Sequence, residues 1–227
     1  FGLSVTMGTM HFGLMFVALE HIHAGTAALI LQTSVPFALL LALIFFRERF
    51  GWRRATGIFI SFAGVTLLVG EPRVNDNLLF AFLALVSALS FGAANLQLRS
   101  LGGVNVFAIN GWMSVFAIPQ MALISWIFES GQIEAIQNAS INTWIAIAHM
   151  GIAVSIVGHG LWYRIVPKYR TNQTMPFTLL IPFFGVSFGI VILGETLTWL
   201  IVGGGLITIV GVAIIVFRRS QNVVEKP

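Results

Sequence analysis

The sequence predicts an all-α integral membrane protein whose helices form an inverted repeat. Three observations support this class: the composition, a series of long apolar segments and a pair of similar stretches. The chain is 57% hydrophobic and 9% charged, with a mean hydropathy of +0.93. A soluble domain carries about 25% charged residues. A chain this apolar cannot cover itself with polar surface in water, so we expect the lipid bilayer to surround it.

Eight apolar segments are candidate transmembrane helices. A helix that crosses a bilayer needs about 20 mostly apolar residues. Charges, Gly, Pro or Asn bound each segment, and the segments cover residues 2–18, 24–46, 54–69, 78–97, 104–128, 143–163, 173–193 and 199–217.

The distribution of Lys and Arg predicts the orientation of these segments. Cytoplasmic loops carry the excess of basic residues. If the C-terminus is cytoplasmic and the connections alternate, Arg73 is the only one of the 12 basic residues outside. The pI of about 10.4 then reflects one membrane face, so we expect no nucleic-acid partner.

Two stretches of the chain resemble each other. Pro36 recurs as Pro182, at an offset of 146 positions. Four further residues recur 147 positions later, namely Glu48, Trp52, Gly57 and Gly64 as Glu195, Trp199, Gly204 and Gly211. In the predicted topology Glu48 lies at the inner face and Glu195 at the outer face. The two copies therefore run in opposite directions, which is a common plan for secondary transporters.

The repeat also predicts the domain organisation. The first three predicted helices match the last three, whereas the fourth and fifth have no counterparts before residue 1. Symmetry therefore predicts ten helices in the complete protein. We divide the chain into a first repeat, residues 1–71, that lacks its first two helices, and a second repeat, residues 72–227, of five helices and a short cytoplasmic tail.

The chain resembles the EamA-like family of the drug/metabolite transporter superfamily. The resemblance is carried by a Pro followed about a dozen residues later by Glu and then by a Gly-rich helix, in each half. These stretches read QTSVPFALLLALIFFRERFGWRRATGIFISFAG and TLLIPFFGVSFGIVILGETLTWLIVGGGLITIVG. The second half is most similar to the bacterial O-acetylserine/cysteine exporters. The resemblance implies helices around a central cavity that opens alternately to either side.

Two prolines occupy matching positions in the predicted spans. Proline has no amide proton, so the carbonyl four residues earlier loses its helical partner. Those carbonyls belong to Gln32, before Pro36, and to Thr178, before Pro182. Paired Pro-interrupted helices indicate the binding site of a transporter. We expect all four residues to line the cavity; the alternative is that both prolines are kinks that fit helix packing.

Histidine, amide and aromatic side chains are the other candidates for substrate binding. Ionisable residues inside a membrane are costly and are functional by default, which favours His11 and His159. A neutral histidine can instead hydrogen-bond a neighbouring helix. Asn110 and Trp162 are further candidates, for which interhelical hydrogen bonding and interfacial anchoring are the alternatives.

No carboxylate lies deep in a predicted span. Glu48 and Glu195 lie at helix ends, where we expect capping or pairing across the halves. A proton relay would have to use His11 or His159, whose charge can change near neutral pH, or the further helices. An uncoupled facilitator is the alternative.

Several glycines lie where small residues let helix backbones approach closely in lipid. We expect this packing role for Gly57, Gly64, Gly203, Gly204, Gly205 and Gly211.

The sequence carries no enzyme or metal motif in a suitable setting. Residues 185–189 fit G-x-S-x-G, but they lie within a predicted span with no Asp or His after them, whereas a nucleophile elbow needs a strand–turn–helix context. Cysteine is absent, and the HIH spacing of His21 and His23 is only a weak metal signal. We therefore expect no enzyme activity, no cofactor and no metal site.

These observations and the resemblance predict an exporter of small metabolites, such as cysteine or O-acetylserine, that works by alternating access in a bacterial inner membrane. Its expected partners are a small-molecule solute and the bilayer, with the proton as candidate coupling ion and a homodimer as candidate assembly. The alternatives are a multidrug, purine or nucleotide-sugar transporter of the same superfamily, and a membrane protein that does not transport.

Overall fold

The computed structural model describes residues 1–46, 51–71, 74, 76–101, 105–161 and 180–217, and every regular element within them is a helix. Two of the helices, η1 and η2, are π-helices. In chain order the helices are η1 (Ser4–Gly13), α1 (Leu14–Leu19), α2 (Ala24–Leu31), α3 (Ser34–Phe45), α4 (Trp52–Val69), α6 (Leu78–Ser100), α7 (Val106–Phe128), α8 (Gln132–Gln137), α9 (Ile141–His149), η2 (Met150–His159), α12 (Leu180–Leu193) and α13 (Trp199–Val216).

Each of the eight predicted spans contains a helix. Within the described residues, five helical stretches are long and apolar enough to cross a membrane, namely Ala24–Phe45, Leu78–Leu98, Phe107–Phe128, Ile141–His159 and Trp199–Val216. Ser4–Leu19 and Leu180–Leu193 are shorter apolar helices. Helix α4 begins with Arg53 and Arg54, which lower its mean hydropathy. The number of spans therefore stays a prediction.

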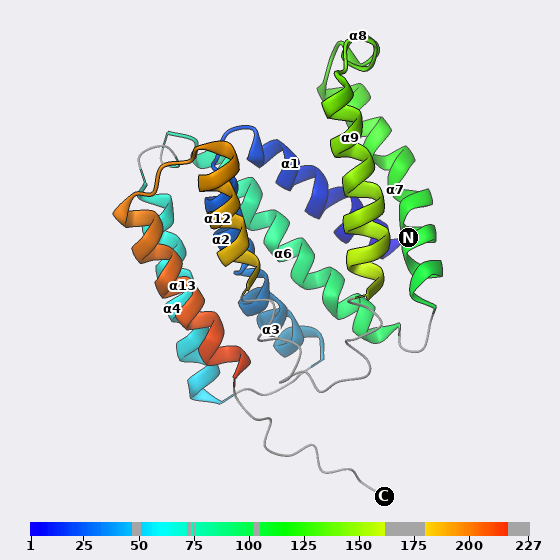
Figure 1. The fold of residues 1–227 in the computed structure, drawn as a ribbon. Helices are drawn as coiled ribbons and strands as arrows, with labels where there is room; N and C mark the ends of the chain where they lie inside the picture. Colours follow the sequence, from blue (N-terminus) through cyan, green and yellow to red (C-terminus); the bar gives the residue numbers. More distant parts are fainter. Residues whose placement is uncertain (47–50, 72–73, 75, 102–104, 162–179, 218–227) are drawn as a thin grey trace, which may run out of the picture.

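Helices α4 and α13 pack along each other at one edge of the molecule (Figure 1). Glycines lie at the crossing, so the two backbones touch. A Cβ atom added at Gly57 would lie 2.8 Å from the Gly211 carbonyl oxygen, and one added at Gly204 would lie 2.8 Å from the Gly64 carbonyl oxygen. Residue numbers rise along one helix as they fall along the other, so the pair is antiparallel.

The contacts between α4 and α13 are symmetric: if each residue is replaced by its counterpart 147 positions away in the other repeat, one contact becomes another. This exchange converts the Gly57–Gly211 contact into the Gly204–Gly64 contact. Ser61 and Thr208 are also 147 positions apart, and the Ser61 hydroxyl lies 3.5 Å from the Thr208 carbonyl oxygen at the centre of the crossing. The repeat seen in the sequence is thus present in the packing of this helix pair.

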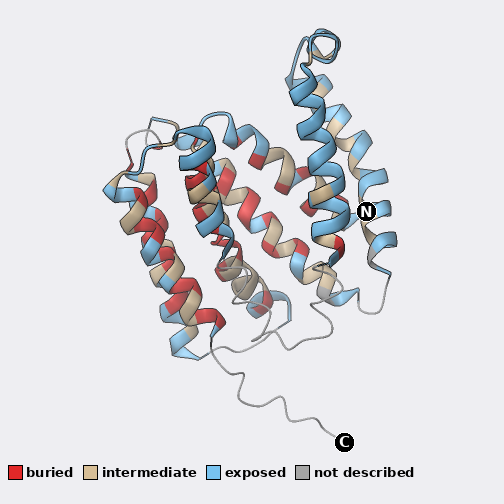
Figure 2. Cartoon of the chain, viewed as in Figure 1, coloured by how far each residue is buried: buried red, intermediate tan, exposed pale blue. Residues whose placement is uncertain are grey.

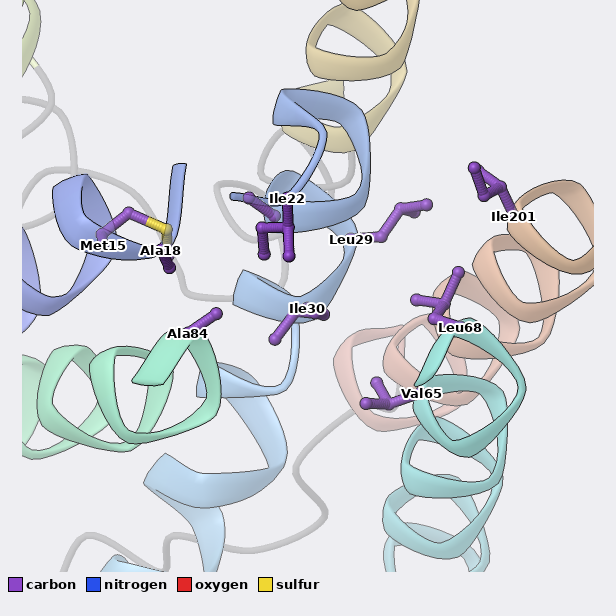
Figure 3. Packing of buried hydrophobic residues seen from close by; sticks show 10 residues of the cluster. Met15, Ala18, Ile22, Leu29, Ile30, Val65, Leu68, Ala84 and Ile201 are labelled. Carbon is purple, nitrogen blue, oxygen red and sulfur yellow. The ribbon is translucent and has the colours of Figure 1, made fainter. Parts of the chain in front are cut away.

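Buried side chains from both ends of the chain form one apolar cluster next to this pair (Figure 3). Its members come from α1, α2, α4, α6, α13 and the α1–α2 connection: Met15, Ala18, Ile22, Ala27, Leu29, Ile30, Val65, Leu68, Ala84 and Ile201. Helix α12 packs on α2, and a Cβ atom added at Gly185 would lie 2.7 Å from that of Ala28. The cluster therefore ties α2 to helices of both repeats.

Helices α7, α8, α9 and η2 form the opposite, mostly exposed side of the molecule (Figure 2). No residue of the most apolar window of Phe107–Phe128 or of Ile141–His159 is buried. The exposed side chains include Trp126, 84% exposed, and Phe128, 80% exposed. Soluble monomers rarely expose apolar surface of this extent, so this side of the molecule suits contact with a bilayer.

The five glycines that contact a neighbouring helix confirm the predicted packing role, and Gly203 does not. Gly57, Gly64, Gly204, Gly205 and Gly211 each have neighbouring-helix atoms within contact distance of an added Cβ, whereas nothing lies within 4 Å at Gly203. Gly203 is one position removed from Gly204, which turns it away from α4.

Gly204→Ala should therefore lower the free energy of unfolding by about 1–3 kcal/mol, because the added methyl group would overpack the crossing. Gly203→Ala in the same helix is the matched control and should change it by no more than about 1 kcal/mol. Reversible unfolding in mixed detergent micelles measures both. Equal effects of the two substitutions would contradict this packing.

Candidate functional site

The helix that contains Pro36 is interrupted in the interior of the molecule. Helix α2 ends at Leu31 and α3 begins at Ser34, so Gln32 and Thr33 form a turn. The backbone amide of Val35 donates to the Gln32 carbonyl over 3.2 Å. Pro36 thus removes the i→i+4 partner of this carbonyl, as predicted, and the chain tightens so that an i→i+3 bond replaces it.

The interruption is lined by polar side chains that are buried. Gln32 is 3% exposed, Thr33 is 0% exposed and Ser34 is 6% exposed. The Thr33 hydroxyl donates to the Ile30 carbonyl over 2.7 Å. A break with buried polar side chains inside a spanning segment is typical of transporter sites.

Both predicted prolines are fully buried, Pro36 in α3 and Pro182 in α12. Thr178 and Trp162 lie outside the described residues, so their predicted roles stay predictions. The polar counterpart of Gln32 in the second repeat is therefore not part of the site described here.

His11 of η1 is buried and pairs with Ser87 of α6. The His11 Nδ1 atom lies 2.8 Å from the Ser87 hydroxyl and 3.3 Å from the Ser87 carbonyl oxygen. The Ser87 hydroxyl donates its only proton to the His11 carbonyl over 2.8 Å. Since both neighbours of Nδ1 then accept, the proton of a neutral His11 belongs on Nδ1 and Nε2 is the acceptor.

Phe12 connects His11 with His159, which comes from η2 in the other repeat. The centroid of the Phe12 ring lies 4.8 Å from that of His11 and 6.4 Å from that of His159. Phe91 of α6 lies on His11 as well, with centroids 4.7 Å apart. The structure thus brings the two predicted histidines to one aromatic group at the junction of η1 and η2.

Amide side chains mostly connect helices. Thr6 donates to Gln97 Oε1 over 3.1 Å, and Thr9 donates to Gln120 Oε1 over 2.7 Å. Gln120 Nε2 donates to Ser4 over 2.9 Å. Asn110 is half-buried on α7, and its side chain makes no hydrogen bond that the described part of the chain shows. Gln97 and Gln120 therefore connect η1 with α6 and with α7, and none of these contacts places Asn110 in the histidine group.

Glu195 joins the two repeats at the start of α2. Its carboxylate accepts the backbone amide of Ala24 over 2.6 Å and that of Gly25 over 3.1 Å. His23 Nδ1 lies 3.4 Å from the same carboxylate, and the two side chains are 13% and 12% exposed. The predicted capping and pairing across the halves is confirmed for Glu195, whereas Glu48 lies outside the described residues.

Most of the chain matches one family of known proteins. The model of the EamA-like transporter family matches residues 1–70 and 78–217. The chain belongs to this family. It is a multi-pass membrane protein, and its family comprises transporters rather than enzymes.

Several curated relatives of this EamA family member are named only as transporters, and three have names that concern amino-acid export. A "Probable amino-acid metabolite efflux pump" of Salmonella typhimurium is 25% identical over 98% of this chain and 78% of its own length. A protein of the same name from Escherichia coli is 26% identical over 95% of this chain and 75% of its own length. A "Probable terminal-alkyne amino-acid exporter" of Streptantibioticus cattleyicolor is 24% identical over 86% of this chain and 65% of its own length.

Other motifs of this EamA family member have packing roles. In the G-x-S-x-G motif, Gly185 packs on α2, and a Cβ atom added at Gly189 would collide with the Glu195 carboxylate. His21 stacks on Phe80 with ring centroids 3.5 Å apart. Within the residues that the structure describes, no group of three potential metal ligands occurs.

Sequence reasoning missed Ser87, Phe12 and the hydroxyl pair of Ser61 and Thr208. Only the pair had a signal in the sequence, since it shares the offset of 147 that relates the repeat glycines. The relation of Ser87 to His11 depends on how η1 and α6 pack.

A double-mutant cycle tests the His11–Ser87 pair. His11→Phe and Ser87→Ala should show a coupling free energy of about 0.6–1.7 kcal/mol, the range for hydrogen bonds between membrane helices. Unfolding in mixed micelles is the measurement. Thr9→Val with Ser87→Ala is the control cycle, because Thr9 pairs with Gln120, and it should be additive within about 0.5 kcal/mol. If the His11–Ser87 cycle showed no larger coupling free energy than the control cycle, the hydrogen bond between His11 and Ser87 would be disproved.

Proposed function

We propose that this protein exports small zwitterionic metabolites, amino acids or their derivatives, by alternating access. The observation that carries the proposal is the interrupted α2–α3 segment, whose buried turn holds Gln32 and is followed by Pro36. In secondary transporters Pro-interrupted segments of this kind, in inverted repeats, indicate the substrate site. The antiparallel, repeat-related packing of α4 and α13 supports this plan.

The chemistry of the polar groups favours a solute without net charge. The groups are an amide at Gln32 and imidazoles at His11 and His159, with the aromatic ring of Phe12 between the histidines. A neutral His11 whose proton is on Nδ1 offers Nε2 as an acceptor, which suits an ammonium group. The Gln32 amide offers a donor for a carboxylate and an acceptor for a hydroxyl.

The relatives support the choice of amino-acid metabolites within this class. Three of them carry names that refer to amino-acid export. Cysteine and O-acetylserine are our preferred substrates, because the second repeat resembles the bacterial exporters of these two solutes. Asn110, Trp162, Thr178 and Pro182 remain proposed cavity residues.

We further propose that the basic face of the protein is cytoplasmic. Arg53 and Arg54 begin α4, and the positive-inside rule places such residues inside. The α2 N-terminus and Glu195 then lie at the outer end of the molecule. Rocking of the two repeats about their contacts would expose the buried turn to either side.

Uptake by everted vesicles containing the full-length protein tests this function. We expect saturable uptake of labelled cysteine, O-acetylserine or a member of an amino-acid panel. Gln32→Ala and His159→Ala should each reduce kcat/KM about tenfold or more, as expected for loss of a polar contact to a charged group.

Matched controls are available in the exposed part of the chain. Gln137→Ala and His149→Ala remove the same side-chain types from α8 and α9, where both residues are exposed, and should leave uptake unchanged. Uptake that survives Gln32→Ala and His159→Ala would keep the transporter and remove this site. A well-folded protein that takes up no panel member would contradict amino-acid export.

A further inference from the structure

We propose that the contact between Glu195 and the N-terminus of α2 is the closed outer gate of this transporter. We define the Glu195 contact as the carboxylate of Glu195 with His23, Ala24 and Gly25. The proposal rests on the proposed function. Alternating access requires the two repeats to separate at the outer side, and the proposal assigns control of that separation to Glu195. In the structure that contact holds the start of α2 against the residue that follows α12 and Gly194.

The backbone around Glu195 is shaped to bring its carboxylate to α2. Gly194 has a φ of 67°, a left-handed conformation that favours glycine. The Glu195 amide donates to the Gly189 carbonyl over 3.0 Å, which turns the chain back over α12. The side chain then passes over Gly189, where a Cβ atom would collide with it, and reaches Gly25, where a Cβ atom would lie 3.2 Å from the carboxylate.

The Glu195 contact is polar and lies near the surface, so water can replace its hydrogen bonds. The carboxylate and the two amides of Ala24 and Gly25 exchange their hydrogen bonds for bonds to water when they separate, so opening costs only the net part of each charge-assisted bond. The α4–α13 crossing differs, because its glycine backbones touch over a buried surface. Opening at Glu195 would also move the start of α2 away from α12, which it touches at Gly25 and Val186, while the repeats stay joined at α4–α13.

A purely structural staple is the competing interpretation. A staple would stabilise the fold and would remain closed during transport. A gate would control whether reagents from the outer side reach the residues beneath it. The two interpretations therefore differ in accessibility, which can be measured without transport.

Thr26, the residue after Gly25, is a suitable buried reporter position next to the contact. It lies in α2, is 0% exposed, and its hydroxyl has no hydrogen-bond partner among the described residues. Thr26→Cys introduces a thiol of similar size. Residues 1–227 contain no cysteine, so once any cysteine outside them is replaced by serine, a membrane-impermeant maleimide in oriented proteoliposomes would report on this position alone.

Glu195→Gln in the Thr26→Cys background keeps the size of the side chain and removes its charge. We expect the labelling rate from the outer side to rise about tenfold, as for loss of a charge-assisted hydrogen bond. Glu134→Gln is the matched control, because Glu134 is exposed on α8, and it should leave the rate unchanged. An equal rate in Glu195→Gln and the control, with intact folding, would overturn the gate.

A covalent link provides the opposite test. His23→Cys with Glu195→Cys, joined by a short bifunctional thiol reagent, should lower labelled amino-acid uptake at least tenfold, and a reducible linker should restore it on cleavage. Each single cysteine variant treated with the same reagent is the control. Full uptake by the linked protein would overturn the gate. Failure of uptake in every variant, with the expected labelling change at Thr26→Cys, would contradict the proposed function and leave the gate in place.

Discussion

The direct contact between the backbones of α4 and α13 is the constraint on which the rest of the structure depends. Helices in lipid gain little from the hydrophobic effect, so their association relies on close packing. Gly57 and Gly64 on α4 face Gly211 and Gly204 on α13, and no side chains separate them at these points. This crossing fixes the two repeats relative to each other and positions α2, which both repeats contact.

The polar groups are distributed around this fixed pair in a way that fits a moving molecule. The buried turn at Gln32 and the histidine group lie on segments with irregular hydrogen bonding, since His11 and His159 belong to π-helices in the two repeats. π-Helical turns occur frequently at functional sites. Glu195 joins the repeats by hydrogen bonds that water can replace. Firm packing and exchangeable bonds therefore occupy different parts of the molecule.

The sequence allowed the helical class, the repeat and most of the packing glycines to be predicted, because these depend on composition and on residue spacing. It could not predict that Val35 would restore the partner of the Gln32 carbonyl, since local tightening of a helix leaves no pattern in the sequence. The packing role predicted for Gly203 was wrong, because one position along a helix rotates a residue by about 100° and so turns Gly203 away from the contact that Gly204 makes. The bonds of Glu195 to Ala24 and Gly25 use backbone amides, which every non-proline residue carries.

The symmetry of the α4–α13 crossing has a consequence for how such a chain can evolve. The contact is self-complementary, as in a two-fold homodimer, yet both partners belong to one polypeptide. In a homodimer every substitution appears on both sides of the axis, whereas here it appears once. Related positions of the two repeats can therefore hold different residues: Ser61 corresponds to Thr208, and Gln32 corresponds to Thr178. One chain can therefore keep a symmetric scaffold while it builds a binding site with two different sides, as recognition of a zwitterion requires.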